Sequence, residues 1–311
     1  MSGQTAFVLS GGGNYGALQV GALKALLERG IAPDLLIGTS AGAINAAYFA
    51  SQPTAAGVDR LAQVWVSVRR EDIYPGTQFH IIWRVLTGSQ SLFPSQAFYK
   101  FLVKHMPHES LTFGDLTKPR LFITAAHLDT GELHLYGEKR DELVIEAIMS
   151  SSALPPFSPP WRGSDGHLHV DGGSVSDLPI GIALKKGARN IYALHIQEVT
   201  AREQRLRSMA EIGHCAIRAL LKVQLANDLA IVRAQRNVRM HYIPLRCPPD
   251  VAPFDFSRSA HMIANGYEQT QAYFDALPKP ASTREQLSAR AQRSLQRLSN
   301  IWKPKYVTLG D

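Results

Sequence analysis

The segment Gly38-Thr39-Ser40-Ala41-Gly42 follows an apolar run and precedes a stretch of small residues with helical spacing. The pattern Gly-x-Ser-x-Gly between a strand and a helix is typical of a nucleophile elbow, a strained turn that exposes a serine hydroxyl above the sheet. Glycine is needed on both sides because a side chain there would collide with neighbouring backbone. The pattern predicts Ser40 as a nucleophile, with Gly38 and Gly42 as supporting residues.

A second glycine-rich turn, GGGNYG at residues 11–16, joins an apolar run to a helical pattern at 17–29. Such a turn directs backbone N–H groups and the positive end of a helix at an anion. Gly11, Gly13 and Gly16 also fit a dinucleotide fingerprint, but the second strand ends in the serine elbow where that fingerprint needs an acidic residue. Parallel neighbouring strands would bring the two turns to one edge of the sheet. We therefore expect an oxyanion hole formed by the amides of Gly11, Gly12, Gly13 and Ala41.

A serine nucleophile requires a base, and Asp171 in the segment VDGG is the strongest candidate. A carboxylate at a strand end, followed by Gly172 and Gly173, is openly accessible to a neighbouring hydroxyl. Taken alone, Asp-Gly is more typical of a hairpin turn. The two other motifs favour the role of a base.

These three motifs, in this order, resemble those of the patatin-like phospholipases, a family of lipid acyl hydrolases with a serine-aspartate dyad. The loop SSALPPFSPP before Asp171 is also similar to the family pattern. The resemblance implies a three-layer α/β/α fold with a mainly parallel central sheet, Ser40 as nucleophile, Asp171 as base, a lipid ester substrate and no cofactor. The family motif usually has a basic residue where this chain has Tyr15, which can donate a hydrogen bond but supplies no charge.

Three alternatives stay open at this stage. One is a Ser40-Asp171-His195 triad, although that fold normally places several strands before the elbow. Another is an inactive binding scaffold, which the presence of both Ser40 and Asp171 disfavours. The third is a metal triad of His167, His169 and Asp171 at alternate strand positions. Nothing else in the sequence supports a metal there, so we expect none.

Alternating strand and helix patterns indicate one α/β domain over residues 6–196. Residues 71–120 show no sustained periodicity of apolar residues, which indicates an insertion of short helices and loops that lines or covers a cleft. Residues 197–311 read as a helical C-terminal extension, with one or two long helices at 201–236. Cys215 and Cys247 are far apart and in no metal-like spacing, so we expect buried, reduced thiols.

The charge distribution singles out the C-terminus. The net charge is +7, and residues 279–311 contain seven Lys or Arg against two acids. From Leu287 to Trp302 an apolar stripe runs beside a basic one, which predicts a helix that either docks on the protein or contacts anionic membrane through 279–306. No nucleic acid partner is expected. No long apolar run or signal peptide is visible, so we expect a cytoplasmic protein, peripheral on the membrane if the tail binds lipid.

Overall fold

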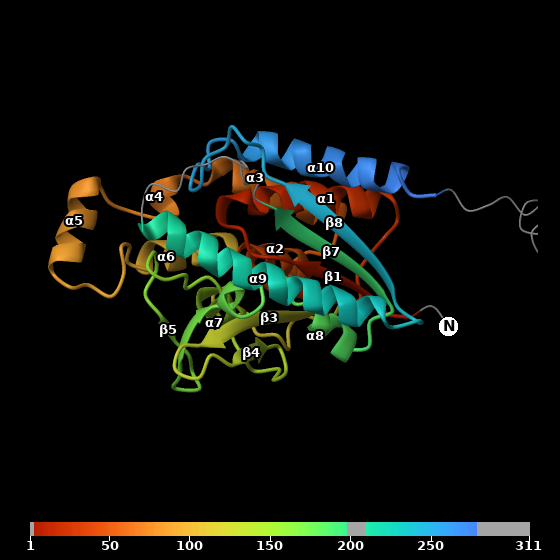
Figure 1. Ribbon diagram of the computed structural model, residues 1–311, viewed down its shortest axis with the longest axis horizontal. Coiled ribbons are helices and arrows are strands. Elements are labelled where there is room, and N and C mark those ends of the chain that lie inside the picture. The colour runs from red at the N-terminus through yellow and green to blue at the C-terminus, as the bar shows by residue number, and fades with distance from the viewer. Residues whose placement is uncertain (1–2, 198–208, 279–311) are drawn as a thin grey trace, which may run out of the picture. The chain divides into compact units, whose positions relative to one another are not determined.

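A computed structural model describes residues 3–197 and 209–278 of the chain. The chain divides into two compact units, Met1–Ala272 and Tyr273–Asp311, and the sheet belongs to the first (Figure 1). The predicted tail helix and the proposed membrane contact at 279–306 lie outside the described residues. None of the helices within the described ranges is long and apolar enough to cross a membrane.

The centre of the fold is an eight-stranded sheet whose hydrogen-bonded neighbours follow the order β5-β6-β3-β2-β1-β7-β8; β4 also pairs with β3, on the edge opposite to that shared by β2 and β6. Strands β1, β2, β3, β7 and β8 run parallel, whereas β4, β5 and β6 are joined by antiparallel pairs. The strands are β1 (Thr5–Leu9), β2 (Leu35–Thr39), β3 (Arg120–His127), β4 (Leu133–Tyr136), β5 (Trp161–Arg162), β6 (Leu168–Asp171), β7 (Asn190–Gln197) and β8 (Arg239–Arg246).

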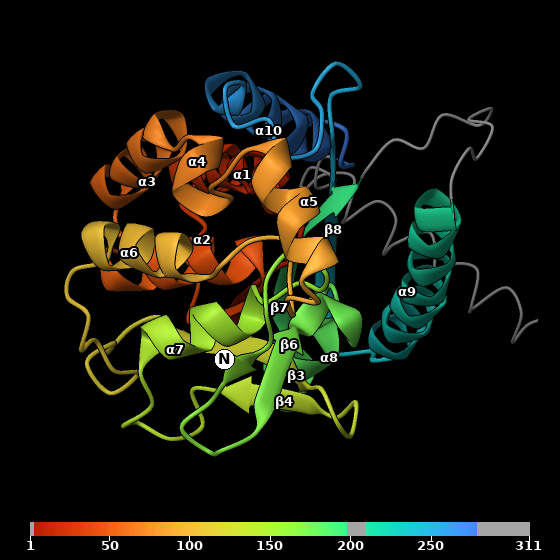
Figure 2. The same cartoon turned by 90° about the vertical axis from the view of Figure 1, so that its left-hand side faces the viewer.

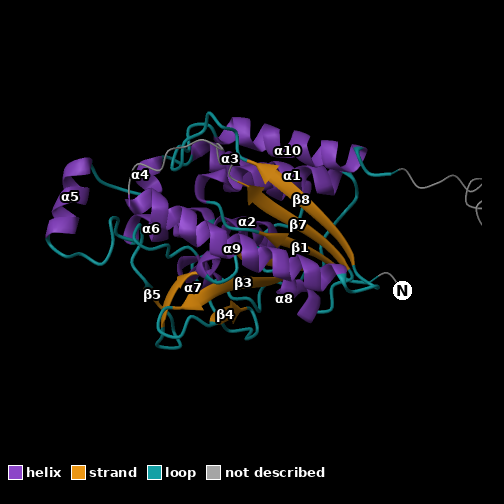
Figure 3. Cartoon of the chain, viewed as in Figure 1, coloured by secondary structure: helices purple, strands orange, loops and turns teal. Residues whose placement is uncertain are grey.

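Helices surround the sheet (Figure 3). In chain order they are α1 (Ala17–Glu28), α2 (Ala41–Ser51), α3 (Ala55–Ser67), α4 (Arg70–Ile73), α5 (Gln78–Leu86), α6 (Gln96–His105), α7 (Val144–Ser151), α8 (Ile180–Lys185), α9 (Met209–Arg233) and α10 (Ser259–Asp275). Two short 3-10 helices, Gly13–Gly16 and Gly172–Ser174, follow β1 and β6.

The alternating faces of the strands explain the layers, because successive side chains of a strand point to opposite sides. Ala6, Val8, Leu35 and Ile37 pack with residues of α8 and α9 in one fully buried cluster. The residues that alternate with them along β1 and β2 point to the opposite face of the sheet, which α1, α2 and α7 cover. Figure 2 shows α8 and α9 on one side of the sheet and α1, α3 and α10 on the other. The predicted α/β/α fold with a mainly parallel sheet is confirmed.

Strand β8 was not expected from the sequence, which suggested only helices after residue 197. Its segment RMHYIPLR contains Pro244, a residue that argues against a central strand. The structure places β8 at the edge of the sheet, where it pairs only with β7, and there a missing N–H is tolerated. Part of the C-terminal extension therefore completes the sheet.

Candidate active site

Ser40 occupies a strained turn between β2 and α2. Its backbone has φ 53° and ψ −121°, a left-handed conformation that non-glycine residues rarely adopt. The flanking glycines have no room for a side chain: a Cβ at Gly38 would lie 2.5 Å from the Gly42 carbonyl oxygen, and one at Gly42 would collide with the Leu9 carbonyl oxygen. The turn has the geometry that the sequence predicted for a nucleophile elbow.

The pairing of β3 explains why Ser40 and Asp171 meet. Thr124 of β3 pairs with β4 on one edge and with β2 on the other. The next residue, Ala125, also pairs with β4 on the first edge, but its partner on the other edge is β6. β2 and β6 therefore occupy the same edge of β3, one after the other. β2 covers this edge up to Thr124 and β6 covers it from Ala125, running in the opposite direction. The carboxyl ends of β2 and β6 therefore face each other, with Ser40 after one and Asp171 at the other.

Asp171 is a buried carboxylate, with 3% of its surface exposed. Burial raises its pKa from 3.8 to about 7, and the nearby charge of Asp177 adds to the rise. Hydrogen bonds from the Ser40 side chain and from the Gly173 N–H, the latter at 2.7 Å, oppose this rise in part. A carboxylate with a pKa near neutrality, bonded to a serine hydroxyl, is suited to accept a proton from it.

The glycine loop begins the 3-10 helix Gly13–Gly16 beside this pair. Gly12 and Gly13 have φ of 152° and 56°, conformations that favour glycine. The first N–H groups of a helix have no acceptor within that helix, which leaves those of Gly12, Gly13 and Ala41 available. The Gly11 N–H instead donates to the Asp177 carbonyl oxygen at 3.3 Å. A Cβ at Gly11 would lie 2.8 Å from Asp177 Oδ1 and 3.3 Å from Ser40 Cβ.

Hydroxyl groups that the sequence motifs did not reveal hold the elbow in place. The Ser40 N–H donates to Ser151 Oγ of α7 at 2.8 Å. Below it, the Thr39 and Thr124 hydroxyls lie 2.7 Å apart and are fully buried. Serine and threonine are too common for such contacts to be recognised from sequence, since the partners come from segments far apart in the chain. The elbow is thus supported by two further elements, α7 and β3.

His195, the third member of the alternative triad, contacts other groups. Its Nε2 lies 3.6 Å from Asp177 Oδ2, and its Nδ1 lies 2.5 Å from the Tyr242 hydroxyl. Among the described residues, the polar partners of His195 are Asp177, Tyr242 and Gln197, and neither Ser40 nor Asp171 is one of them. This arrangement favours the dyad over the Ser40-Asp171-His195 triad.

Tyr15 and Asn14 of the glycine loop anchor a distant segment. The Tyr15 hydroxyl donates to the Val251 carbonyl oxygen at 2.8 Å. The Asn14 side chain donates to the carbonyl oxygens of Ala252 and Asp255 and accepts from the Phe254 N–H. Tyr15, which replaces the usual basic residue, therefore attaches the loop at 251–255 to the glycine turn.

A cavity of about 1360 Å³ opens onto Ser40, Asp171 and Gly11–Gly13. Its walls are mostly aromatic and aliphatic, and they include residues of the 71–120 segment. Apolar side chains from several elements contribute: Ile44, Tyr48, Leu61, Val64, Trp65, Ile73, Tyr74, Phe98, Phe101, Leu102, Met106, Leu154, Phe157, Leu221, Leu225, Phe254 and Phe256. The volume exceeds the roughly 300–1000 Å³ usual for small-molecule sites.

Known proteins with similar sequences show the family of this chain. The sequence model described as patatin-like phospholipase matches residues 7–184, more than half of the chain. The chain belongs to the patatin-like phospholipase family. Patatin-like phospholipase domain-containing protein 6 of Homo sapiens is 29% identical over 198 residues, which are 63% of this chain and 14% of that protein. Neuropathy target esterase sws of Drosophila melanogaster is 31% identical over 196 residues, 61% of this chain and 12% of that protein. This family member thus spans a small part of these relatives.

Among solved structures, VipD from Legionella pneumophila aligns with a TM-score of 0.49 at 17% identity, covering 89% of this chain and 67% of that one. ExoU, in its heterodimeric complex with SpcU from Pseudomonas aeruginosa, aligns with a TM-score of 0.40 at 17% identity. That alignment covers 88% of this chain and 51% of ExoU.

Proposed function

We propose that this protein is a serine hydrolase of lipid esters that acts through a Ser40-Asp171 dyad. The observation that carries the proposal is the placement of Ser40, on its strained turn, beside a buried Asp171 at the wall of a large apolar cavity. Family membership supports the same reaction class.

In the first half of the reaction, the Asp171 carboxylate takes the proton of the Ser40 hydroxyl as Oγ attacks the ester carbonyl carbon. The carbonyl electron pair moves to oxygen and forms a tetrahedral oxyanion. The N–H groups of Gly12, Gly13 and Ala41 stabilise this charge, whereas the Gly11 N–H is engaged by Asp177. Collapse of the intermediate breaks the bond to the alkoxy group, which leaves as an alcohol with the proton from Asp171.

In the second half, water attacks the acyl-Ser40 ester and gives its proton to Asp171. The same oxyanion contacts form again, and collapse releases a carboxylic acid and returns the proton to Ser40. The pKa of Asp171, raised to about 7, suits a group that accepts and returns a proton in each half-reaction.

The cavity supports a substrate with long acyl chains. Its walls are apolar on α2, α3 and α6 and in the loop at 154–158, and Lys222 is the one Lys or Arg among its described lining residues. Burial of a hydrocarbon chain against such walls is favourable at about 0.8 kcal/mol per CH₂. A phospholipid or another lipid ester fits this surface better than a small polar ester.

Helix α5 supports contact with a lipid surface. Phe79, Trp83 and Leu86 are 75%, 56% and 80% exposed, and Ile82 and Val85 are also exposed. An apolar helix surface with tryptophan is typical of segments that lie at a membrane interface. We include peripheral membrane contact through α5 in the proposed function.

A fluorophosphonate probe tests the dyad directly, because it labels an activated serine and not an ordinary one. We expect labelling of the wild type and none of Ser40→Ala, together with loss of nitrophenyl ester hydrolysis. Ser158→Ala is the matched control, since Ser158 lines the same cavity and should leave both readouts unchanged. Labelling of a folded Ser40→Ala variant would reject the assignment.

A further inference from the structure

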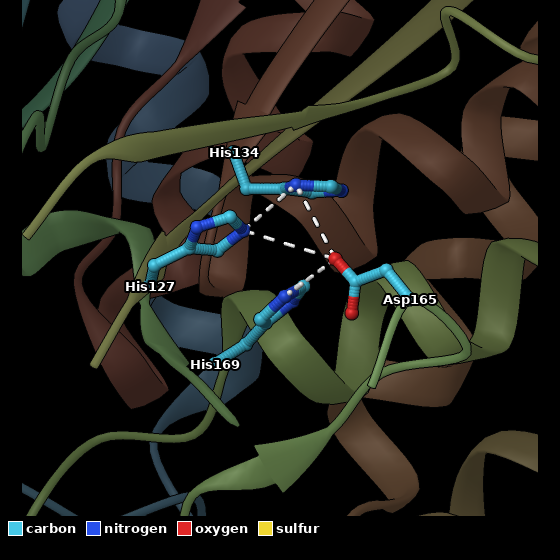
Figure 4. Close-up of side chains that lie close together, drawn as sticks. All are labelled: His127, His134, Asp165 and His169. Atoms are coloured by element: carbon cyan, nitrogen blue, oxygen red, sulfur yellow. Dashed lines mark hydrogen bonds and ion pairs between the residues drawn. The ribbon is translucent and has the colours of Figure 1, made fainter. Parts of the chain in front are cut away.

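Three histidines and one aspartate converge at the edge of the sheet that carries Asp171 (Figure 4). His127 ends β3, His134 lies in β4, and His169 lies in β6. Asp165 comes from the turn between β5 and β6. The four candidate ligand atoms all lie within 4.8 Å of one another.

Four of the six separations between these ligand atoms are close to those of a tetrahedral metal site. His127 Nε2 lies 3.1 Å from His134 Nδ1, and His169 Nε2 lies 3.1 Å from Asp165 Oδ2. Asp165 Oδ2 is 3.8 Å from both His127 Nε2 and His134 Nδ1. Zinc with ligand bonds of about 2.0–2.1 Å places tetrahedral ligand atoms about 3.3–3.4 Å apart. These four separations lie within about 0.5 Å of the tetrahedral values, and those from His169 to His127 and His134 are at most 4.8 Å.

Strand register explains why the histidines share one site. His127 and His169 are directly opposite each other in the β3–β6 pair, so their side chains point to the same face. His134 is opposite Ala125, two residues before His127, and therefore points to that face as well. The sequence spacing of these residues, across 127–169, gives no metal-binding signature.

A second layer of contacts orients His169. Its Nδ1 lies 2.7 Å from the Tyr136 hydroxyl, which is 2.9 Å from Ser150 Oγ of α7, and all three residues are buried. Metal-binding histidines usually use their second ring nitrogen in this way, which fixes the ring and leaves the other nitrogen for the metal. The arrangement directs Nε2 of His169 at the centre of the cluster.

We propose that His127, His134, His169 and Asp165 form a zinc site that joins β3, β4 and β6. Three neutral imidazoles and one carboxylate are a ligand set that zinc prefers, and four protein ligands close the site to substrate, as in structural zinc centres. The site holds β6 two residues before Asp171. It differs from the His167-His169-Asp171 group considered from sequence, and it departs from the expectation that no metal binds.

Zinc titration of the chelator-treated full chain, read against a chromogenic chelator, tests the site, with metal content per chain measured by mass spectrometry. We expect one zinc per chain and a rise in Tm on zinc addition. Cobalt substitution should give the visible absorption of a tetrahedral centre. Asp165→Asn should weaken zinc binding on the order of 10-fold or more, and Tyr136→Phe about 10-fold to 100-fold.

His167→Gln is the matched control. The His167 ring stacks on His127 with centroids 4.7 Å apart, but it lies outside the four proposed ligands. The His167→Gln variant should bind zinc with the affinity of the wild type. Asp165 is partly exposed, and circular dichroism will show whether Asp165→Asn retains the native fold. Absence of stoichiometric zinc, unchanged affinity in a folded Asp165→Asn variant, or loss of binding in His167→Gln would each overturn the proposal.

Discussion

Replacement of Asp171 by asparagine should abolish ester hydrolysis but raise the free energy of unfolding at high pH. Burial raises the pKa of Asp171 from 3.8 to about 7, so the folded chain retains a proton between these values that the unfolded chain has released. Each pH unit in this window removes about 1.4 kcal/mol of stability as pH rises. At pH 8 the ionised carboxylate costs about 4 kcal/mol, whereas asparagine has no charge to bury.

We therefore expect Asp171→Asn to be more stable than the wild type at pH 8, by up to about 4 kcal/mol. The advantage should shrink as pH falls through this window and vanish below about 4, where Asp171 becomes protonated in both the folded and the unfolded chain. Asparagine retains an oxygen that can accept from Ser40 and Gly173, which limits other losses. Urea unfolding at several pH values measures the difference, and nitrophenyl ester hydrolysis by the same variant should be abolished.

In the wild type, kcat/KM should rise with pH to a plateau above 7 and fall about tenfold per pH unit well below it. Asp177→Asn is the matched control, since the Asp177 charge contributes to the raised pKa. That variant should remain active, with its midpoint moved to lower pH. If wild type and Asp171→Asn showed the same pH dependence of stability between pH 5 and 8, the burial argument would be refuted.

Three further predictions follow from the site. His195→Ala should retain substantial esterase activity, because the dyad needs no imidazole; a folded variant as inactive as Ser40→Ala would favour the triad. Gly12→Ala should lower kcat more than it raises KM. If one oxyanion donor is lost, the fall in kcat should correspond to about 2.7–4 kcal/mol; a change in KM alone would contradict this. Replacement of both Phe79 and Leu86 by serine should reduce vesicle binding and spare soluble ester turnover, measured by co-sedimentation and nitrophenyl hydrolysis; unchanged binding would remove α5 from the interface.

Short-range patterns were sufficient to predict the fold and to select the residues of the candidate site. The glycine loop, the elbow and the Asp171 turn each lie next to a strand end, and parallel pairing of β1 and β2 brings the first two together. The fold prediction is confirmed, whereas the catalytic roles of Ser40 and Asp171 stay predictions. The amphipathic tail helix lies outside the described residues.

Contacts between distant segments could not be predicted in this way. The support of Ser40 by Ser151 depends on how α7 lies against the elbow, and neither residue carries a signature for it. Likewise, the histidine cluster depends on the register of β3 with two other strands. Strand β8 was missed because Pro244 is informative only once its edge position is known.

The shared edge of β3 has a consequence for how such a protein can evolve. Ser40 and Asp171 are brought together by the pairing of β2 and β6 with consecutive residues of β3, so their separation does not depend on the length of chain between the strands. The segment between β2 and β3 supplies much of the cavity wall. Insertions and deletions there can reshape the acyl-chain pocket while the reacting groups remain in register. Substrate range and chemistry are therefore free to diverge at different rates.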